Sequence, residues 1–240
     1  MKYEELGGGF IKKREKRVVG LFIDGTGLDR ATRRINRKVD MTALVRGVTS
    51  GLTPVVARYY TLIPFEDDSR HRAFLDAVAR AGLSVIVKRL PPKGITRQVS
   101  VDLEMAADMV AFSLGLSSFS KENEYMPTDH PLRAAAPVHG GTVSNFGRKQ
   151  AAPATASIEP APASQPDGEK SLLSRDTDLA ALRSVVVVCP SRELAYPLGM
   201  AKDLGCDTTS ADFGQFNTGD VLKSAAKWID LSDSETIWRD

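Results

Sequence analysis

The sequence predicts a globular α/β protein with a mainly parallel sheet, and three observations support this fold class. Apolar runs rich in β-branched residues recur along the chain, as expected of strands buried on both faces. Stretches with helical spacing of apolar residues separate these runs, and such alternation favours βαβ units with parallel strands. The composition, 42% hydrophobic and 26% charged over 240 residues, suits a chain that buries a sizeable core.

The sequence marks the ends of several elements. The first strand-like run, RVVGLFID, ends at Asp24. Asp40 and Ser69 are expected helix N-caps, and Gly82 and Gly205 are expected to end helices. The expected strands are residues 17–24, 54–62, 83–89 and 184–189, and the expected helices are residues 41–49, 69–81, 101–114, 193–204 and 221–229.

One segment breaks the alternation. Residues 116–176 are rich in Ala, Pro, Ser and Gly and contain few large apolar side chains, so they predict a long disordered insertion. His130 and His139 lie there without other ligands at metal spacing, and zinc is not expected. The predicted organisation is a basic N-terminal extension (1–16), a first domain part (17–115), the insertion (116–176), a second domain part (177–231) and a C-terminal tail (232–240).

The chain has the character of a cytoplasmic protein. No apolar run approaches the roughly 20 residues that cross a bilayer, so no membrane contact is expected. The first ten residues lack the apolar stretch of a secretory signal. Cys189 and Cys206 fit neither a disulfide framework nor metal-ligand spacing, and buried thiols are expected.

Charge is unevenly distributed, although the formal net charge is only +2. Lysines and arginines crowd residues 12–38, which indicates a surface that faces a polyanion, because neutralising phosphates releases counterions. A helix over residues 28–38 would place four guanidinium groups on one face. The alternative is an ordinary solvated face. The four residues are Arg30, Arg33, Arg34 and Arg37.

Asp24 is the first candidate for chemistry. Ligands of open α/β sheets bind beyond the carboxyl ends of the strands, where Asp24 is expected, and residues 25–27 are expected to form a loop beside it. Phe22 stands where haloacid-dehalogenase-like phosphatases carry their nucleophilic Asp, which argues against an aspartyl-phosphate intermediate. The chain also lacks a glycine-rich phosphate-binding motif after this strand.

Further carboxylates lie in the expected helix SVDLEMAADMV. Asp102 opens this helix, where the helix dipole alone would favour it, and Glu104 suits a solvated face. Asp108 lies about 9 Å farther along the helix axis, so Asp102 and Asp108 need not share one ion. A direct metal contact for one and a water-mediated or structural role for the other is expected.

These segments together resemble the NYN family of PIN-like nucleases, in its LabA-like branch. The resemblance runs in order through VGLFIDGTGL, VVARYYTL, LSVIVKRL, SVDLEMAADMV, VVVVCPSRELAYPLGMAKDLG and LKSAAKWIDL. It implies a parallel sheet with helices on both faces and cleavage of RNA that depends on Mg²⁺ or Mn²⁺. It also implies metal ligands at Asp24, Asp102 and Asp108.

The sequence departs from the family pattern at two places. After the fourth expected strand the family has Ser-Gly-Asp-x-Asp-Phe, where this chain has Ser191 and Glu193 in place of the two aspartates. Serine is a poor ligand for a hard cation, and Glu193 would act through water. Gly27 stands where the family has Asn. Arg97 and the arginine-rich helix would hold the RNA backbone. Tyr59 or Tyr60 could stack on a base, although core packing is expected for at least one of them, because alternate strand residues point to opposite faces.

Two functions from different classes follow. The first is a metal-dependent RNA endonuclease, which the three retained aspartates favour. The second is a catalytically impaired scaffold that binds RNA or protein within a larger assembly, with a protein partner held through the insertion or a second copy of the chain. Ser191, Gly27 and the insertion favour the scaffold. A nucleotide-binding regulatory protein is a third alternative, although no phosphate loop supports it.

Overall fold

The computed structural model describes six stretches of the chain. They are residues 17–66, 69–116, 118–128, 182–214, 219–232 and 235–239. The basic extension and residues 129–181, which include His130, His139 and most of the expected insertion (116–176), lie outside the described residues. Within the described stretches, no helix combines the length and the apolar character that crossing a membrane requires.

The centre of the fold is a six-stranded sheet in which all strands are parallel. Its strand order is β3-β2-β1-β4-β5-β6, with β1 and β4 as neighbours in the middle. The strands are β1 (Val18–Asp24), β2 (Val56–Ile63), β3 (Ser84–Arg89), β4 (Arg183–Val188), β5 (Asp207–Asp212) and β6 (Lys227–Asp230).

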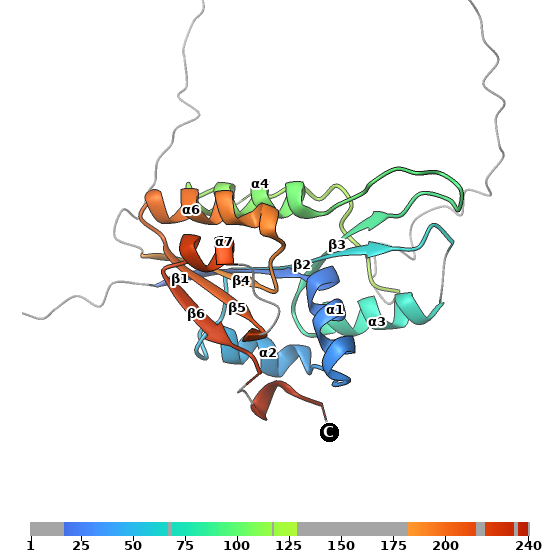
Figure 1. Cartoon of the computed structure of the whole chain (residues 1–240), viewed down its shortest axis with the longest axis horizontal. Coiled ribbons are helices and arrows are strands. Elements are labelled where there is room, and N and C mark those ends of the chain that lie inside the picture. The colour runs from blue at the N-terminus through green and yellow to red at the C-terminus, as the bar shows by residue number, and fades with distance from the viewer. Residues whose placement is uncertain are drawn as a thin grey trace, which may run out of the picture.

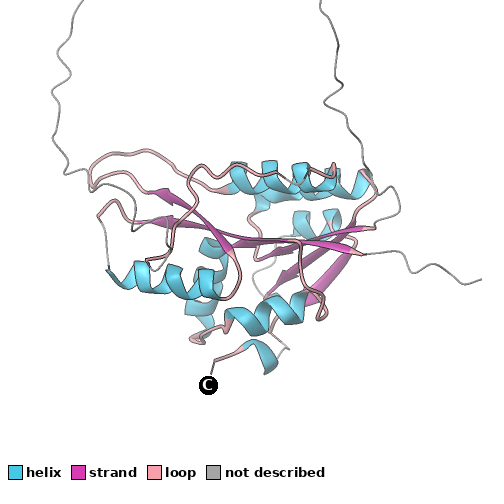
Figure 2. Ribbon diagram, turned by 180° about the vertical axis from the view of Figure 1, so that it is seen from behind, coloured by secondary structure: helices cyan, strands magenta, loops and turns pink. Residues whose placement is uncertain are grey.

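Helices cover both faces of this sheet (Figures 1 and 2). One face carries α1 (Gly25–Ile35), α2 (Met41–Val48) and α3 (Ser69–Arg80), and the other carries α4 (Asp102–Ser113), α6 (Ala195–Asp203) and α7 (Gly219–Ser224). Two short 3-10 helices are η1 (Arg192–Leu194) and η3 (Glu235–Ile237). The predicted fold class, a parallel sheet with helices on both faces, is therefore confirmed.

Two apolar clusters hold the three layers together. Alternate residues of a strand point to opposite faces, so Leu21 and Ile23 of β1 pack toward α1, α2 and α3, whereas Phe22 packs toward α4. Phe22 meets Phe112 of α4 edge to face, with ring centroids 6.0 Å apart. A strand buried on both faces needs the continuous apolar run that predicted β1 and β4.

The strand order creates a switch point between β1 and β4. From β1 the sheet grows through β2 and β3 to one side, and from β4 it grows through β5 and β6 to the other. In such sheets a crevice opens at the carboxyl ends of the two central strands, because the connections leave them in opposite directions. Asp24 ends β1, and Ser191 follows β4, at this crevice.

The C-terminal part of the sheet was incompletely predicted. No strand was expected at β5, and the expected helix over residues 221–229 is wrong, because α7 ends at Ser224 and β6 begins at Lys227. The sequence DTTSAD of β5 has no large apolar side chain. Its Thr208 and Ser210 are nevertheless fully buried, and the Thr208 hydroxyl accepts a hydrogen bond of 2.9 Å from the Ala226 amide.

The chain also stays with the fold beyond residue 116, where the insertion was expected to begin. Residues 118–128 run along the outer side of β3, in hydrogen-bonding contact with it. The Val87 amide donates to the Asn123 carbonyl at 2.8 Å, and the Tyr125 amide donates to the Val85 carbonyl at 2.7 Å. The Tyr125 hydroxyl reaches Asp76 of α3 at 2.8 Å. Backbone hydrogen bonds, rather than a large apolar content, hold this segment.

Candidate functional site

Asp24 is both the last residue of β1 and the N-cap of α1. Its Oδ1 accepts hydrogen bonds of 3.0 Å from the amides of Thr26 and Gly27, and its side chain is only 5% exposed. The loop expected over residues 25–27 is therefore wrong, because this cap starts the helix at Gly25. Both cap bonds use Oδ1, and neither uses Oδ2.

The pKa of Asp24 is raised to about 6, chiefly by burial and also by the negative charge of Asp102. Hydrogen bonds from the Gly27 and Thr26 amides and the positive charge of Arg30 act in the opposite direction. The charges that act on Asp24 are thus Asp102 of α4 and Arg30 of α1. A buried carboxylate with a second carboxylate near it is favourably placed for a cation.

Asp102 is the first residue of α4 and is held by two serines. The Ser191 hydroxyl donates to Asp102 Oδ1 at 2.8 Å, and the Ser100 hydroxyl donates to Oδ2. The Asp102 amide in turn donates to the Ser100 hydroxyl at 2.9 Å. Ser191, at the position where an aspartate was expected, thus links the segment after β4 to the start of α4.

Lys88 supports this arrangement from β3. Its Nζ donates to the Ser100 carbonyl at 2.8 Å and pairs with Glu104 at 2.6 Å. Glu104 was expected on a solvated face, but it forms a half-buried ion pair with Lys88 instead. The sequence analysis did not single out Lys88 or Ser100. The sequence signal that could have identified Lys88 is its place near the end of an apolar strand.

Asp108 does not join Asp24 and Asp102. Its side chain is buried and forms an ion pair with Arg58 of β2, and it accepts a hydrogen bond of 2.7 Å from the Tyr60 hydroxyl. Arg58 also donates to the Ser120 carbonyl at 2.8 Å. A carboxylate neutralised by a buried guanidinium is a structural element, and we leave Asp108 out of the candidate site.

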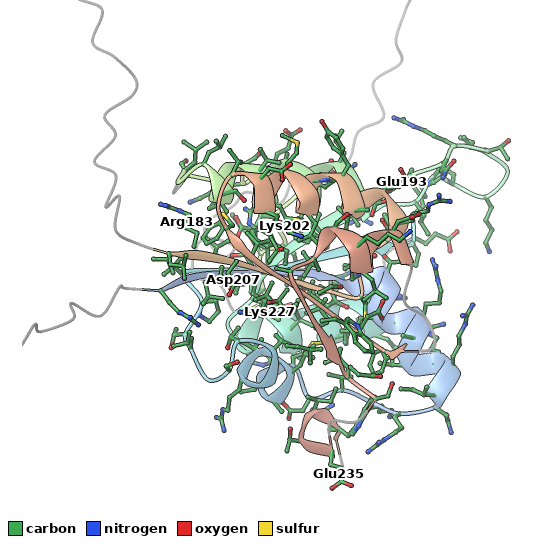
Figure 3. All side chains as sticks on the ribbon, turned by 60° about the vertical axis from the view of Figure 1, so that its left-hand side comes forward. Arg183, Glu193, Lys202, Asp207, Lys227 and Glu235 are labelled. Atoms are coloured by element: carbon green, nitrogen blue, oxygen red, sulfur yellow. The ribbon has the colours of Figure 1, made fainter. Side chains whose placement is uncertain are left out.

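Glu193 and Gly27 mark two further positions from the sequence analysis. Glu193 lies in η1, is exposed, and sits at the end of the sheet away from Arg183 and Asp207 (Figure 3). A Cβ atom at Gly27 would collide with the Cys189 carbonyl oxygen. The first turn of α1 and the end of β4 are thus too close for any side chain, including the Asn of the family pattern.

A second buried carboxylate lies along the same edge of the sheet. Asp212 ends β5, is 5% exposed, and accepts hydrogen bonds from the Phe213 amide, at 2.7 Å, and from the Cys189 thiol. Burial, with help from the charge of Asp230, raises the pKa of Asp212. Asp212 was not predicted as a site residue, because no strand was expected at β5.

The arginines proposed to bind RNA do not form one helical face. Arg30, Arg33 and Arg34 are exposed on α1, but the helix ends at Ile35, and Asn36 adopts a left-handed conformation with φ of 52°. Arg37 therefore leaves the helix, and its guanidinium lies 4.1 Å from the centre of the Trp238 ring. Arg97 is exposed in the segment that precedes α4.

The donor set suits one cation and no more. Among the residues that the structure describes, no group of three or more His, Cys, Asp or Glu side chains is arranged to hold a metal ion. Asp24 and Asp102 remain as a pair at the crevice. Mg²⁺ is commonly bound by one or two carboxylates together with water and substrate phosphates, so this pair fits such an ion.

The fold and the site thus define an α/β protein with a carboxylate pair at the switch point of a parallel sheet. Residues 18–117 match the family model of the NYN domain, a stretch that runs from β1 through α4 and contains Asp24 and Asp102. This match supports the NYN family for that part of the chain, and the family suggests the PIN-like nuclease superfamily.

A solved structure from Vibrio parahaemolyticus, of a protein of unknown function, has the same overall fold. The two share 8% sequence identity and superpose with a TM-score of 0.59, over 95% of this chain and 100% of the Vibrio chain. At this identity the likeness concerns the fold alone. A search of curated protein sequences found no match.

Proposed function

We propose that the protein is a divalent-metal-dependent RNA endonuclease of the NYN family, in its LabA-like branch, with a one-cation site. The observation that supports the proposal is that Asp24, at the end of β1, lies near enough to Asp102 to feel its charge, while Ser191, just after β4, holds Asp102 by a hydrogen bond. The two carboxylates come from separate elements, and one of them is buried. The resemblance to metal-dependent nucleases is the reason to assign metal binding to this pair.

Asp24 and Asp102 would hold the ion, Mg²⁺ or Mn²⁺. A bound divalent ion supplies charge neutralisation at the scissile phosphate and a water of lowered pKa. The protein's own contribution is positioning. Ser191 and Ser100 fix both oxygens of Asp102, and the Thr26 and Gly27 amides fix Oδ1 of Asp24. Glu193 would act through water, and Arg30 and Arg97 would contact the RNA backbone.

The second candidate is a scaffold that binds RNA without cleaving it. Two observations favour it: Arg58 and Tyr60 engage Asp108, and a serine rather than an aspartate contacts Asp102. The site therefore has fewer anionic ligands than the family pattern implies, and cleavage is expected to be slow.

Cleavage of single-stranded RNA in Mn²⁺ tests the proposal. Asp24→Asn and Asp102→Asn should each reduce the rate by about 100-fold or more, as loss of a group that stabilises the transition state does. Asparagine can still cap α1, so the fold should be kept. The matched control is Asp203→Asn, an exposed carboxylate at the end of α6, which should leave the rate unchanged.

The outcomes separate the two candidates. Cleavage that requires Mn²⁺, Asp24 and Asp102 supports the nuclease. RNA binding with no cleavage in any divalent ion supports the scaffold. If the protein does not bind RNA at physiological salt, both fail, and a protein partner becomes the working hypothesis.

A further inference from the structure

Helices α1 and α3 lie on the face of the sheet opposite α4 (Figure 1). Residues of both helices line two cavities, with volumes of about 490 and 370 Å³. Four residues line both cavities, so the two adjoin, and together they are called the α1–α3 groove. The shared residues are Asp29, Arg33, Tyr59 and Phe74.

The larger cavity has a strongly cationic wall. Arg33, Arg37, Lys38 and Arg239 line it against the single carboxylate of Asp29. Asp29 accepts a hydrogen bond from Arg33 at 2.9 Å and so neutralises only that arginine. Arg37, Lys38 and Arg239 have no second carboxylate beside them among the residues that line the cavity, and their positive charges favour an anionic occupant.

The chain builds this wall from two segments. Val39 and Trp238 form an antiparallel bridge, and the Arg239 amide donates to the Lys38 carbonyl at 2.8 Å. The same pairing places the Trp238 ring under the Arg37 guanidinium, 4.1 Å from the ring centre. The backbone pairing thus holds the two cationic segments side by side, and the Trp238 ring holds the Arg37 guanidinium; preorganised charges bind at lower entropic cost.

The floor of the groove is apolar and aromatic. Leu28 and Tyr59 are buried beneath it, and Phe74 is 45% exposed. The Phe74 ring meets Tyr59 edge to face, with centroids 6.2 Å apart, which holds it in a defined orientation. An exposed aromatic ring beside cations suits an unpaired base with its phosphates, because every base has a face that stacks.

The smaller cavity leads back to the candidate site. Gly25 and Thr26, which directly follow Asp24, line it. A polymer bound in both cavities would therefore have one end at the first turn of α1, next to Asp24 in the sequence, and the other end at the cationic wall. A base-paired duplex does not fit cavities of this size with its bases exposed to Phe74, whereas a single strand does.

We propose that the α1–α3 groove binds single-stranded RNA that extends from the Asp24–Asp102 site, with a base on Phe74 and phosphates on Arg37 and Arg239. The inference rests on the proposed function for the position of the strand's other end. It adds the surface on which the strand lies, with Phe74 and Arg239 as contacts, and the direction in which the strand leaves the site.

Fluorescence anisotropy with labelled oligouridines of increasing length tests the groove without cleavage, in EDTA. Affinity should rise with length until the strand fills both cavities. Arg37→Ala and Arg239→Ala should each weaken binding and reduce the slope of log Kd against log salt by about 0.7. Phe74→Leu, which keeps an apolar side chain but removes the stacking face, should weaken binding roughly tenfold. Arg46→Ala is the matched control, an exposed arginine of α2 that does not line the groove.

Three results would overturn the proposal. The first is that the Arg37, Arg239 and Phe74 variants bind RNA as tightly as the Arg46→Ala control does. The second is uridine monophosphate binding as tightly as the longest strand, and the third is a duplex binding as tightly as a single strand. The cleavage assay is independent: groove-dependent binding without cleavage would reject the nuclease alone, and cleavage that the groove variants do not affect would reject the groove alone.

Discussion

Asp102 and Asp108 lie on the same helix, yet the protein uses them differently. Asp102 lies at the start of α4, at the crevice. Its carboxylate accepts hydrogen bonds from the Ser100 and Ser191 hydroxyls, and its amide donates to the Ser100 hydroxyl. Asp108 lies in the interior, where Arg58 neutralises its charge and the Tyr60 hydroxyl donates a hydrogen bond to it. The comparison shows that the partner, rather than the residue type or its place in a motif, decides whether a carboxylate is available to a ligand.

The largest difference is expected in stability. Asp108→Asn should lower the free energy of unfolding by about 3–5 kcal/mol, because it leaves the Arg58 guanidinium buried without a counter-charge. Urea denaturation measures this change. Asp102→Asn, at the crevice, should cost less than about 1 kcal/mol. An equal cost for the two variants would contradict the assignment of separate roles.

A double variant tests whether the unpaired charge of Arg58 causes the loss of stability in Asp108→Asn. Replacing both partners with apolar residues of similar size, Arg58→Met with Asp108→Leu, should restore most of the stability that Asp108→Asn loses. If the double variant is no more stable than the single one, the loss does not come from the unpaired charge.

The stability of the protein should also depend on pH through Asp24, the buried carboxylate at the end of β1. The pKa of Asp24 is 3.8 in the unfolded chain and about 6 in the fold. Between these values the folded state binds the proton that the unfolded state has released, so the contribution of Asp24 to stability falls as pH rises from about 4 to 6. The total loss is about 3 kcal/mol. Asp24→Asn should remove it, so the difference in stability between the variant and the wild type should grow over this window. A constant difference would contradict the raised pKa.

A smaller effect is expected at the Tyr60 hydroxyl. Tyr60→Phe removes one hydrogen bond to Asp108 and should cost about 2 kcal/mol, typical of a bond to a charged group. Thermal denaturation beside Tyr196→Phe, an exposed tyrosine of α6, measures the difference. Equal midpoints would show that Arg58 alone holds Asp108.

The smallest expected effect, about 1.4 kcal/mol, concerns the crevice. Ser191→Asp would place another carboxylate beside Asp102 and should tighten Mn²⁺ binding about tenfold, because hard cations prefer anionic oxygen. Isothermal titration calorimetry measures the affinity, and Ser191→Asn is the uncharged control. If Asp and Asn at this position bind Mn²⁺ equally, the crevice is not a metal site.

The sequence predicted the elements that bury apolar side chains and missed those that bury polar ones. The runs of β1 and β4 are unmistakable because both their faces are covered. β5 buries threonine and serine instead, and periodicity carries no signal for such a strand. The ends of α3 and α6 were predicted from Gly82 and Gly205, which adopt left-handed conformations with φ of 88° and 87°.

The candidate site was predictable only in part. Asp24 and Asp102 followed from their places at the ends of expected elements. The structural role of Asp108 could not be predicted, because its partner Arg58 is far away in the sequence. An arginine within the apolar run VVARYY was a signal, since a buried guanidinium requires a carboxylate. The pairing itself depends on packing between β2 and α4.

The segment of residues 118–128 has a consequence for how the molecule meets copies of itself. By occupying the outer hydrogen-bonding positions of β3, it removes a free sheet edge that another chain could extend. At the opposite edge, β6 has only four residues and begins with the charged Lys227. Strand addition and edge-to-edge aggregation are thus discouraged on both sides, and any self-association is expected to proceed through helices or loops.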